Sequence, residues 1–376
     1  MIRTSILVVL ACVILLASGC TAGDEVRGAW VSAWGHGYLS PEEVDATIAA
    51  AKKAGINTLY IQVRKTGDAY YKSTLEPRAT NIAKADFDPL DYTIKQAHAQ
   101  GIKVHAWVNA YRIWSKTPNN DPKHIVNAHP DWINKDVNGS TTASEGVYLD
   151  PGVPAVREHI TKVVMEIVKN YDVDGVQWDY IRYPGQKWGY SDTALARFYA
   201  ETKTNTKPDP KDEKWSQWRR DQVTELVRMV HKQVKAVKPN VQMSASTIAW
   251  GNYDPDFKKT DCYAGVFQDW KSWVANDILD ANLPMVYKSE KYPKSAQSFR
   301  GWLQGFKKWN SGKGKPTYVG IEVSFSDNAG VLAQVEAIRK AGLQGFVLFD
   351  FKQSKSRDAL VDAFAAAAEK ATAKAK

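Results

Sequence analysis

Residues 171–184 contain the side chains whose types and spacing best suit catalysis, in the order Tyr-Asp-Val-Asp-Gly-Val-Gln-Trp-Asp-Tyr-Ile-Arg-Tyr-Pro. The aspartates and the glycine at the start are turn formers, so a short strand is predicted to follow them. Alternate residues of a strand share a face, which places Gln177 and Asp179 opposite Val176 and Trp178. A polar row that ends in a carboxylate is unusual for a buried strand, but it suits a strand lining a barrel whose open end performs chemistry.

Several other predicted strands also end in polar residues. If their aliphatic rows face a surrounding layer of helices, the last residues facing the lumen are Arg64, Asn109, Asp179, Glu322 and Asp350, together with Tyr287. Polar residues that converge at the carboxyl ends of barrel strands are typical of catalytic sites. A single buried acid could instead form an ion pair with Arg64 or Arg182. The convergence of several such residues favours a site.

Two carboxylates across a cleft are the minimum equipment for cleaving a glycosidic bond. One protonates the leaving oxygen, while the other supports the oxocarbenium-like centre or activates water. Asp179 is the first candidate for the nucleophile or stabiliser, and the candidates for its partner are Asp269, Glu322 and Asp350. Asp269 lies among tryptophans, where a partly desolvated acid could keep its proton. The same residue could equally cap a helix that begins at Trp270.

Other chemistries find little support in the sequence. The histidines lack metal-ligand spacing, no Gly-x-Ser-x-Gly motif is present, and Cys262 stands alone once the N-terminal segment is set aside. We therefore expect neither a metal site nor a cofactor. The formal net charge of +9 is spread along the chain and suits binding to an anionic polymer or a membrane surface. Nucleic acid is a less suitable partner, because an exported protein meets little of it. The 14 tryptophans offer faces for stacking on sugars.

The N-terminus has the features of an export signal. A positive residue, Arg3, precedes an apolar run too short to span a membrane, and Ala17-Ser-Gly-Cys20 follows. This arrangement resembles a bacterial lipobox, which predicts a lipoprotein signal peptide over 1–19 and a lipidated Cys20 that opens a tether over 20–27. A plain secretory signal with a chance cysteine is the alternative. The lipidated form would be a lipoprotein of the cell envelope, facing the periplasm from the outer membrane in a Gram-negative cell.

Residues 28–376 alternate between strand-like and helix-like patterns, which predicts an α/β fold, a single (β/α)8 TIM barrel. A doubly wound open sheet is the alternative, but no glycine-rich phosphate turn follows a strand. The predicted strands are Gly28–Trp34, Thr58–Arg64, Lys103–Asn109, Gly175–Tyr180, Gln242–Thr247, Asn282–Tyr287, Thr317–Glu322 and Gly345–Asp350. The predicted helices are Pro41–Ala54, Pro89–Gln100, Pro154–Asn170, Trp215–Val237, Trp270–Ile278, Ser295–Lys308, Ala329–Ala341 and Asp358–Ala373. Long loops after the third and fourth strands, Arg112–Asp150 and Gly185–Glu213, would lie on the catalytic face.

Segments spread over nearly the whole mature chain resemble the glycosyl hydrolase-like 10 family of bacterial lipoproteins and secreted enzymes. They are Arg27–Val31, Gly55–Thr58 with Gln62–Arg64, Val104–Asn109, His129–Trp132, Leu149–Gly152, Tyr171–Gly175 with Asp179–Pro184, Gln268–Trp270, and Ile278–Asp280 with Pro284–Tyr287. The resemblance implies a TIM-barrel glycosidase, and some members of the family cleave peptidoglycan glycan strands that have lost their stem peptides. It also implies that Asp179 is the family's strand-four acid. Glu322 matches no family motif and remains a candidate from strand alternation alone.

The residues predicted to contact the glycan combine these two lines of reasoning. They are Arg64, Trp107, Asn109, Tyr111, Asp150, Trp178, Arg182, Tyr183, Trp250, Trp270, Tyr287 and Asp350. The predicted function is a lipid-anchored glycoside hydrolase acting on a cell-wall glycan, most consistently peptidoglycan. Another extracellular polysaccharide as substrate, or a carbohydrate-binding lipoprotein without catalysis, stays open, as does the oligomeric state. A tether of at most roughly 20–25 Å would hold the floor of the barrel toward the membrane.

Overall fold

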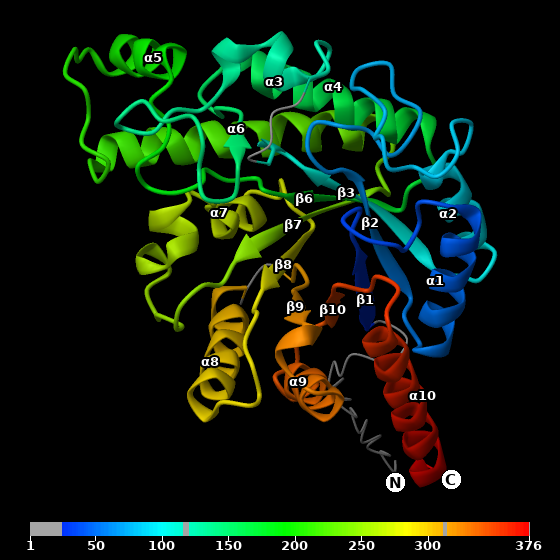
Figure 1. Cartoon of the computed structure of the whole chain (residues 1–376). Coiled ribbons are helices and arrows are strands. Elements are labelled where there is room, and N and C mark those ends of the chain that lie inside the picture. The colour runs from blue at the N-terminus through cyan, green and yellow to red at the C-terminus, as the bar shows by residue number, and fades with distance from the viewer. Residues whose placement is uncertain (1–24, 116–119, 311–313, 376) are drawn as a thin grey trace, which may run out of the picture.

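The computed structural model describes residues 25–115, 120–310 and 314–375, and its centre is a closed barrel of eight parallel strands (Figure 1). Around the barrel the order is β1-β10-β9-β8-β7-β6-β3-β2, so each strand lies beside its predecessor and the last strand closes onto the first. The strands are β1 (Val26–Val31), β2 (Thr58–Arg64), β3 (Lys103–Asn109), β6 (Gly175–Asp179), β7 (Gln242–Ile248), β8 (Ala281–Met285), β9 (Tyr318–Glu322) and β10 (Gly345–Phe349). The predicted (β/α)8 barrel is confirmed.

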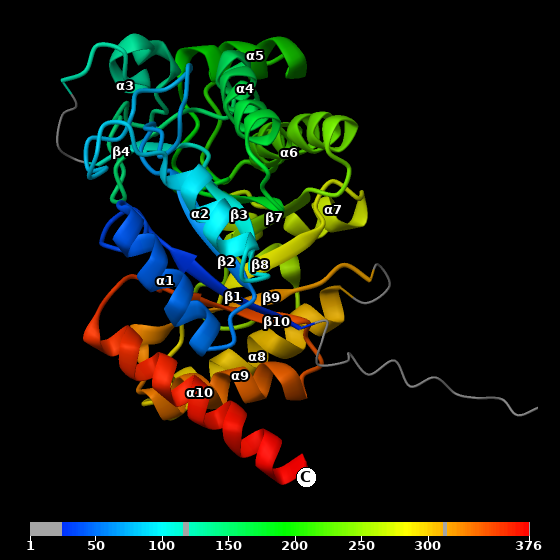
Figure 2. The ribbon, with the colours of Figure 1, turned by 90° about the vertical axis from the view of Figure 1, so that its right-hand side faces the viewer.

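Helices follow the strands and surround the barrel (Figures 1 and 2). They are α1 (Pro41–Lys53), α2 (Pro89–His98), α4 (Pro154–Asn170), α6 (Glu213–Val237), α7 (Trp270–Ala275), α8 (Pro293–Trp309), α9 (Asn328–Lys340) and α10 (Lys355–Ala375). Their starts are encoded locally. Ser40 accepts a hydrogen bond from the Glu43 N–H and Asp88 accepts one from the Asp91 N–H, and each is followed by a proline in the first turn.

Buried residues on the two faces of the strands form two separate clusters. The inner one fills the lumen with Trp30, Tyr60, Trp107, Ala281, Leu283, Tyr318 and Val347. The outer one lies between strands and helices and includes Val176, Trp178, Phe346 and Leu348. The predicted alternation is therefore correct for β6. The predicted alternation is wrong for β10, where Val347 and Phe349 face the lumen. Both faces of this strand are apolar, so its sequence does not distinguish the inner face from the outer one.

A β-bulge in β2 changes the direction of Arg64. The register between β2 and β3 shifts between Gln62 and Arg64, so that Arg64 pairs with Val108, whose side chain belongs to the outer cluster. An inserted residue inverts the alternation beyond it. Arg64 consequently lies outside the lumen, so the prediction that it faces the lumen is wrong.

Both long excursions carry structure of their own, which the sequence did not predict. The first contains β4 (Arg112–Trp114), α3 (Ile125–Ala128), η1 (Pro130–Trp132) and β5 (Val147–Tyr148), with β4 and β5 paired antiparallel. The second contains α5 (Asp192–Thr202), whose Ala194 and Phe198 pack against Trp215 and Trp218 of α6. Figures 1 and 2 both show α3 and α5 on the same side of the barrel as α4 and α6. Shorter turns are η2 (Phe257–Lys259), η3 (Asp261–Gly265) and η4 (Val323–Phe325).

The predicted signal peptide and Cys20 lie outside the described residues. Within the part of the chain that the structure describes, none of the helices combines the length and apolar character needed to cross a bilayer. The barrel begins two residues before the predicted boundary at 28, with β1 starting at Val26.

Candidate active site

A cavity of about 290 Å³ opens at the carboxyl ends of the barrel strands, with Asp179 in its wall. Strands from around the barrel contribute to its lining. The lining residues are Trp30, Trp34, Gln62, Trp107, Glu145, Asp179, Tyr180, Arg182, Ser246, Ile248, Trp250, Met285, Tyr287 and Phe349. Of the predicted site residues, the structure thus brings together Asp179, Trp107, Arg182, Trp250 and Tyr287. Two acids and a ring of aromatic faces in one cavity suit a sugar polymer.

Donors on three sides hold the buried Asp179 carboxylate. Trp107 Nε1 donates to Oδ2 at 3.1 Å, the Tyr180 N–H donates to Oδ1 at 2.7 Å, and Arg182 Nη1 lies 3.6 Å from Oδ1. Burial raises the pKa of Asp179 above that of an ordinary aspartate, although the Arg182 charge and these hydrogen bonds lower it. Such donors orient a carboxylate and favour its charged form, which suits a nucleophile or an electrostatic stabiliser.

The backbone turns sharply directly after this acid. Tyr180 has a φ of 47°, a left-handed conformation that is uncommon for an aromatic residue. The turn aims the Tyr180 N–H at Asp179 and places the phenol ring 4.2 Å beneath the Arg182 guanidinium. The strand end and the following turn therefore fix the acid and the arginine together.

Glu145, which no sequence pattern indicated, supplies the second carboxylate of this cavity. Its Oε1 lies 3.3 Å from Arg182 Nη2, and its Oε2 accepts a hydrogen bond from the Tyr148 hydroxyl at 2.6 Å. Arg182 thus contacts both Asp179 and Glu145, which keeps the two carboxylates near each other. The two acids need not touch, because the catalytic carboxylates of glycosidases stand up to about 9.5 Å apart. The Glu145 side chain is 33% exposed, so it is the more solvated acid. It lies just before β5 in the first excursion, and pairing of β4 with β5 carries it over the mouth.

Exposed aromatic rings flank the cavity. Trp34 and Trp250 are 54% and 44% exposed, unusual values for such large apolar side chains. Inside the cavity, Tyr287 stacks on Phe349 with ring centroids 5.5 Å apart. Rings that remain partly open to solvent at a mouth containing acids are suited to stacking on sugars.

Glu322 and Asp350 line a neighbouring cavity of about 570 Å³ that shares Trp34 and Phe349 with the first. The Ser32 hydroxyl donates to Asp350 at 2.5 Å, and Glu322 accepts hydrogen bonds from Ser324. Burial raises the pKa of both acids. They therefore lie on the same face of the barrel as Asp179 but in an adjoining depression.

Asp269 does not join these acids. It caps α7, accepting the Ser272 N–H, and lines a separate cavity of about 480 Å³ with Phe257 and Trp309. The capping alternative is therefore the one that the structure supports. Trp270, the next residue, is buried among Phe257, Phe306 and Trp309 and presents no face to the mouth.

Two further predicted contacts, Arg64 and Asn109, have internal partners. Arg64 is fully buried, forms an ion pair with Glu76 at 2.6 Å, and donates to the carbonyl oxygens of Asn109 and Ala110. Asn109 donates to the Lys65 carbonyl oxygen at 2.7 Å. Both side chains hold the strand ends and their loops together, below the surface that a substrate would contact.

The remaining predicted contacts are buried behind the mouth. Asp150 accepts hydrogen bonds from the Gly152 N–H at 2.8 Å, the Ser191 N–H at 3.4 Å and the Tyr183 hydroxyl at 3.4 Å, so it ties the two excursions together. Tyr111 and Trp178 belong to the outer apolar cluster. None of these four side chains lines the cavity around Asp179.

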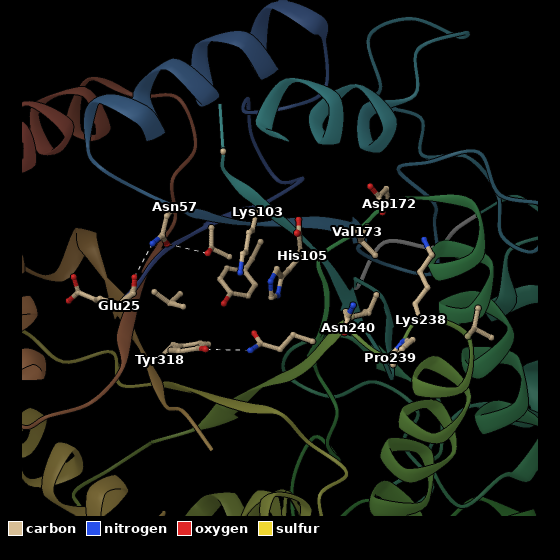
Figure 3. A pocket seen from close by; sticks show the side chains of 18 residues that line it. Glu25, Asn57, Lys103, His105, Asp172, Val173, Lys238, Pro239, Asn240 and Tyr318 are labelled. Carbon is tan, nitrogen blue, oxygen red and sulfur yellow. Dashed lines mark hydrogen bonds between the residues drawn. The ribbon is translucent and has the colours of Figure 1, made fainter. Parts of the chain in front are cut away.

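A larger cavity of about 930 Å³ lies at the opposite, amino-terminal end of the strands (Figure 3). Glu25, Lys103 and Lys238 are among its lining residues, and His105 and Tyr318 belong to its wall. Burial lowers the pKa of His105 to about 4, so this histidine is neutral near pH 7. Active sites of such barrels occupy the carboxyl-terminal face, so we assign this cavity to the floor. Across the described ranges, no group of three or more histidine, cysteine or acidic residues is arranged to hold a metal.

A closed (β/α)8 barrel with acids and aromatic rings at its carboxyl-terminal mouth is the arrangement found in barrel glycoside hydrolases. Known structures share the fold. The glycoside hydrolase domain of PgaB (BpsB) from Bordetella bronchiseptica superposes with a TM-score of 0.65 at 14% identity, covering 90% of this chain and 99% of that one. The catalytic domain of β-amylase from Paenibacillus polymyxa gives 0.63 at 12% identity, covering 91% and 97%.

The sequence comparisons define the family. The glycosyl hydrolase-like 10 profile matches residues 25–329, and the chain belongs to this family, as its motifs predicted. Glycosyl hydrolase DigH of Escherichia coli K12 is 30% identical over 299 residues, which cover 72% of this chain and 63% of DigH. Glycosyl hydrolase YngK of Bacillus subtilis 168 is 31% identical over 255 residues, covering 63% and 47%. The alignments thus span less than two thirds of either relative.

Proposed function

We propose that the protein is a lipid-anchored glycoside hydrolase of the cell envelope that cleaves the glycan strands of peptidoglycan. The observation that carries the proposal is the pair of carboxylates, Asp179 and Glu145, bound to one guanidinium in a cavity walled by aromatic rings. Membership of the glycosyl hydrolase-like 10 family supports glycosidic cleavage. Peptidoglycan as the substrate rests on the family resemblance, and lipidation rests on the Ala17–Cys20 motif.

In the mechanism that we infer, Asp179 is the nucleophile or stabiliser and Glu145 is the proton donor. The N–H donors of Trp107 and Tyr180 keep the Asp179 carboxylate aimed at the cavity, where it would face the developing oxocarbenium centre. Glu145 is more solvated and lies on a loop, so it can exchange protons with water between turnovers. Arg182 would hold the two acids in register while its charge favours the ionised form of Asp179.

Product analysis tests this proposal. Purified sacculi, peptide-free glycan strands and neutral polysaccharides would each be digested, and the products identified by mass spectrometry. We expect the wild type to release oligosaccharides from the peptide-free strands and Asp179→Asn to release none. Products from a neutral polysaccharide alone would favour the other substrate class. Unchanged ligand binding by Asp179→Asn, with no turnover by either form, would identify a carbohydrate-binding protein.

The anchor has its own test. Metabolic labelling with a palmitate analogue should mark the wild-type chain and not Cys20→Ser, and membrane fractionation should release the variant. Labelling of both forms, or of neither, would contradict lipidation at Cys20.

A further inference from the structure

The barrel floor holds the largest of the cavities described above, about 930 Å³ against about 290 Å³ at the catalytic mouth. It lies where the strands begin, and its wall includes polar side chains from several of them: Tyr60 of β2, His105 of β3, Gln242 of β7 and Tyr318 of β9. Figure 3 shows His105 and Tyr318 at this hollow, and the Gln242 amide donates to the Tyr318 hydroxyl at 3.4 Å. Sites for small molecules span roughly 300–1,000 Å³, so the floor has room for one.

Two glycines leave the space in which Tyr60 and His105 lie. A Cβ atom on Gly28 of β1 would stand 2.9 Å from Tyr60 Cε2, and one on Gly175 of β6 would stand 2.3 Å from His105 Nδ1. Both distances are shorter than the roughly 3.5–4.0 Å of ordinary atomic contacts. The neighbouring strands therefore admit two large polar side chains to a layer of the lumen that branched apolar residues usually fill in such barrels.

Tyr60 and His105 are buried, yet each has a polar atom without a partner. The residues are 0% and 3% exposed, and within the described ranges neither the Tyr60 hydroxyl nor His105 Nδ1 has a hydrogen-bond partner. The two rings pack edge to face with centroids 4.9 Å apart, a contact that involves neither of these atoms in a hydrogen bond. Buried polar groups are almost always hydrogen-bonded, to the protein or to a bound molecule. Two such groups on one cavity wall therefore indicate a ligand.

The innermost groups of the cavity favour a neutral ligand. Burial lowers the pKa of His105 to about 4 and raises the pKa of Tyr60 well above its usual range, so both are neutral near pH 7. A charged group of a ligand would be buried beside them without a counter-charge, which is unfavourable. A phenol, a neutral imidazole and an amide can each donate and accept hydrogen bonds, and so can the hydroxyl groups of a sugar.

The charged residues of the lining select no ion of either sign. Glu25, Asp174 and Lys238 have partners within the protein: they contact Arg339, His98 and the Tyr171 carbonyl oxygen, respectively. Lys103 and Asp172 are exposed, and their charges are opposite. An ammonium and a carboxylate can both form charge-assisted hydrogen bonds with hydroxyl groups. The rim therefore suits a polyhydroxylated molecule better than a simple anion or cation.

We propose that the barrel floor is a second saccharide-binding site, which holds a neutral mono- or disaccharide against Tyr60, His105 and Tyr318. Tyrosine combines an apolar ring with a polar tip, which matches the apolar face and the hydroxyl edge of a sugar. No bond is formed or broken at this site, and the inference does not depend on the proposed activity at the mouth. The sugar could arrive as a free oligosaccharide or as the head group of a glycolipid.

Histidine NMR tests the site, because His105 belongs to the floor cavity whereas the described residues around the catalytic cavity include no histidine. The full chain carrying Asp179→Asn is labelled at histidine and kept in a detergent without a sugar head group. The His105 signal is assigned by comparison with His105→Gln. The ligands are maltose and N,N′-diacetylchitobiose as free sugars, octyl maltoside below its micelle concentration as a sugar head group, and glutamate and phosphate as charged comparisons.

We expect the neutral sugars to shift the His105 signal in a saturable way and the charged ligands to leave it in place. Tighter binding of octyl maltoside than of maltose would support the site and assign the ligand to a glycolipid, and equal affinity would assign it to a free sugar. Tyr60→Phe should weaken the binding about two- to tenfold, the effect of losing one hydrogen bond. The melting temperature of the free variant should be unchanged or higher, because the hydroxyl has no protein partner to lose.

A matched control is Tyr92→Phe on α2, which removes a hydroxyl that contacts Asp45 outside the barrel. It should leave the saccharide affinity unchanged. A His105 signal that no sugar moves, or that glutamate or phosphate moves instead, would overturn the proposal. So would equal affinities of Tyr60→Phe and its parent together with a lower melting temperature of the variant, since the hydroxyl would then be bound to ordered water. Failure of the proposed function would look different, because the floor would bind sugar while the wild type released no product from any glycan.

Discussion

Trp107 on β3 and Asp179 on β6 are joined by a 3.1 Å hydrogen bond from the indole Nε1 to the carboxylate Oδ2. The two residues sit on neighbouring strands, in which Trp107 pairs with Gln177 and Asn109 pairs with Asp179. Strand register thus places a tryptophan donor beside the acid. Of the three groups that hold the Asp179 carboxylate, the Trp107 N–H is a side-chain donor that one substitution can remove.

Trp107→Phe should move the acid limb of the pH profile to higher pH. The indole N–H stabilises the charged carboxylate, so its removal raises the pKa of Asp179, which burial has already raised. In the proposed mechanism the ionised form of Asp179 is the active one, so activity should be lost as the pH falls through that pKa. The measurement is kcat/KM against pH, with Trp30→Phe as control because its indole donates to Gln177 instead. An acid limb that stays in place or moves to lower pH would contradict this role.

Glu145→Gln should reduce kcat on natural glycan by roughly 10²–10⁴-fold, because the amide cannot protonate the leaving oxygen. An aryl glycoside with a good leaving group needs little protonation, so its cleavage should fall far less. Comparing the two substrates on the same preparation makes the test independent of the active fraction. Equal losses on both substrates, or no loss on either, would remove Glu145 from the acid pair.

The buried ion pair of Arg64 and Glu76 should support stability rather than catalysis. Glu76→Gln leaves the Arg64 charge buried without its partner, which should cost about 3–5 kcal/mol in the free energy of unfolding. Despite burial, which acts in the other direction, the Arg64 charge and the His159 hydrogen bond lower the pKa of Glu76 from 4.5 to about 2. Its contribution is therefore present above pH 4.5 and is lost as the pH falls toward 2.

Urea unfolding at several pH values measures this contribution, and the wild type and Glu76→Gln should converge at acid pH. If Glu76→Gln does not fold, the free energy of unfolding of the wild type, measured against pH, tests whether the contribution of Glu76 is lost at acid pH. A gap between the two proteins that is constant with pH would show that Glu76 acts through something other than its charge.

The proposed lipid anchor at Cys20 predicts an orientation of the barrel at the membrane. Glu25 and Val26 are among the residues that line the floor cavity (Figure 3). This cavity lies at the amino-terminal ends of the strands, whereas Asp179 ends β6. A short segment from Cys20 would hold this floor toward the lipid and turn the catalytic mouth toward the wall. Lengthening the segment with a flexible insert should change the digestion rate of intact sacculi but not that of soluble glycan fragments. Parallel changes in both rates would argue against this orientation.

The sequence predicted the barrel well because each element carries local signals. Proline and a capping residue start helices such as α1 and α2, and aliphatic alternation marks strands such as β2 and β3. Asp179 could be assigned to the mouth for the same reason, since it ends a strand whose two faces differ sharply. Its neighbours Trp107 and Arg182 followed from the same short-range spacing.

The rest of the site depends on information that does not lie within one element. The bulge at Gln62/Arg64 reverses the side of β2 on which Arg64 lies, and both faces of β10 are apolar. Glu145 reaches the cavity only because β4 and β5 pair across a long excursion, a contact that a local pattern does not encode. Asp269 has tryptophan neighbours in the sequence, as a catalytic acid could, but its side chain caps the amino terminus of α7.

The central claim is that Asp179 is the acid that makes this cavity a glycosidase site. Its most direct test is product formation from peptide-free peptidoglycan glycan by the wild type, Asp179→Asn and the matched control Asp269→Asn, with folding checked by circular dichroism. We predict released oligosaccharides with the wild type and the control, and release that is slower by roughly 10²–10³-fold or more with Asp179→Asn at similar glycan affinity, because a group that stabilises transition-state charge contributes about that much. Wild-type rates with Asp179→Asn would contradict the account.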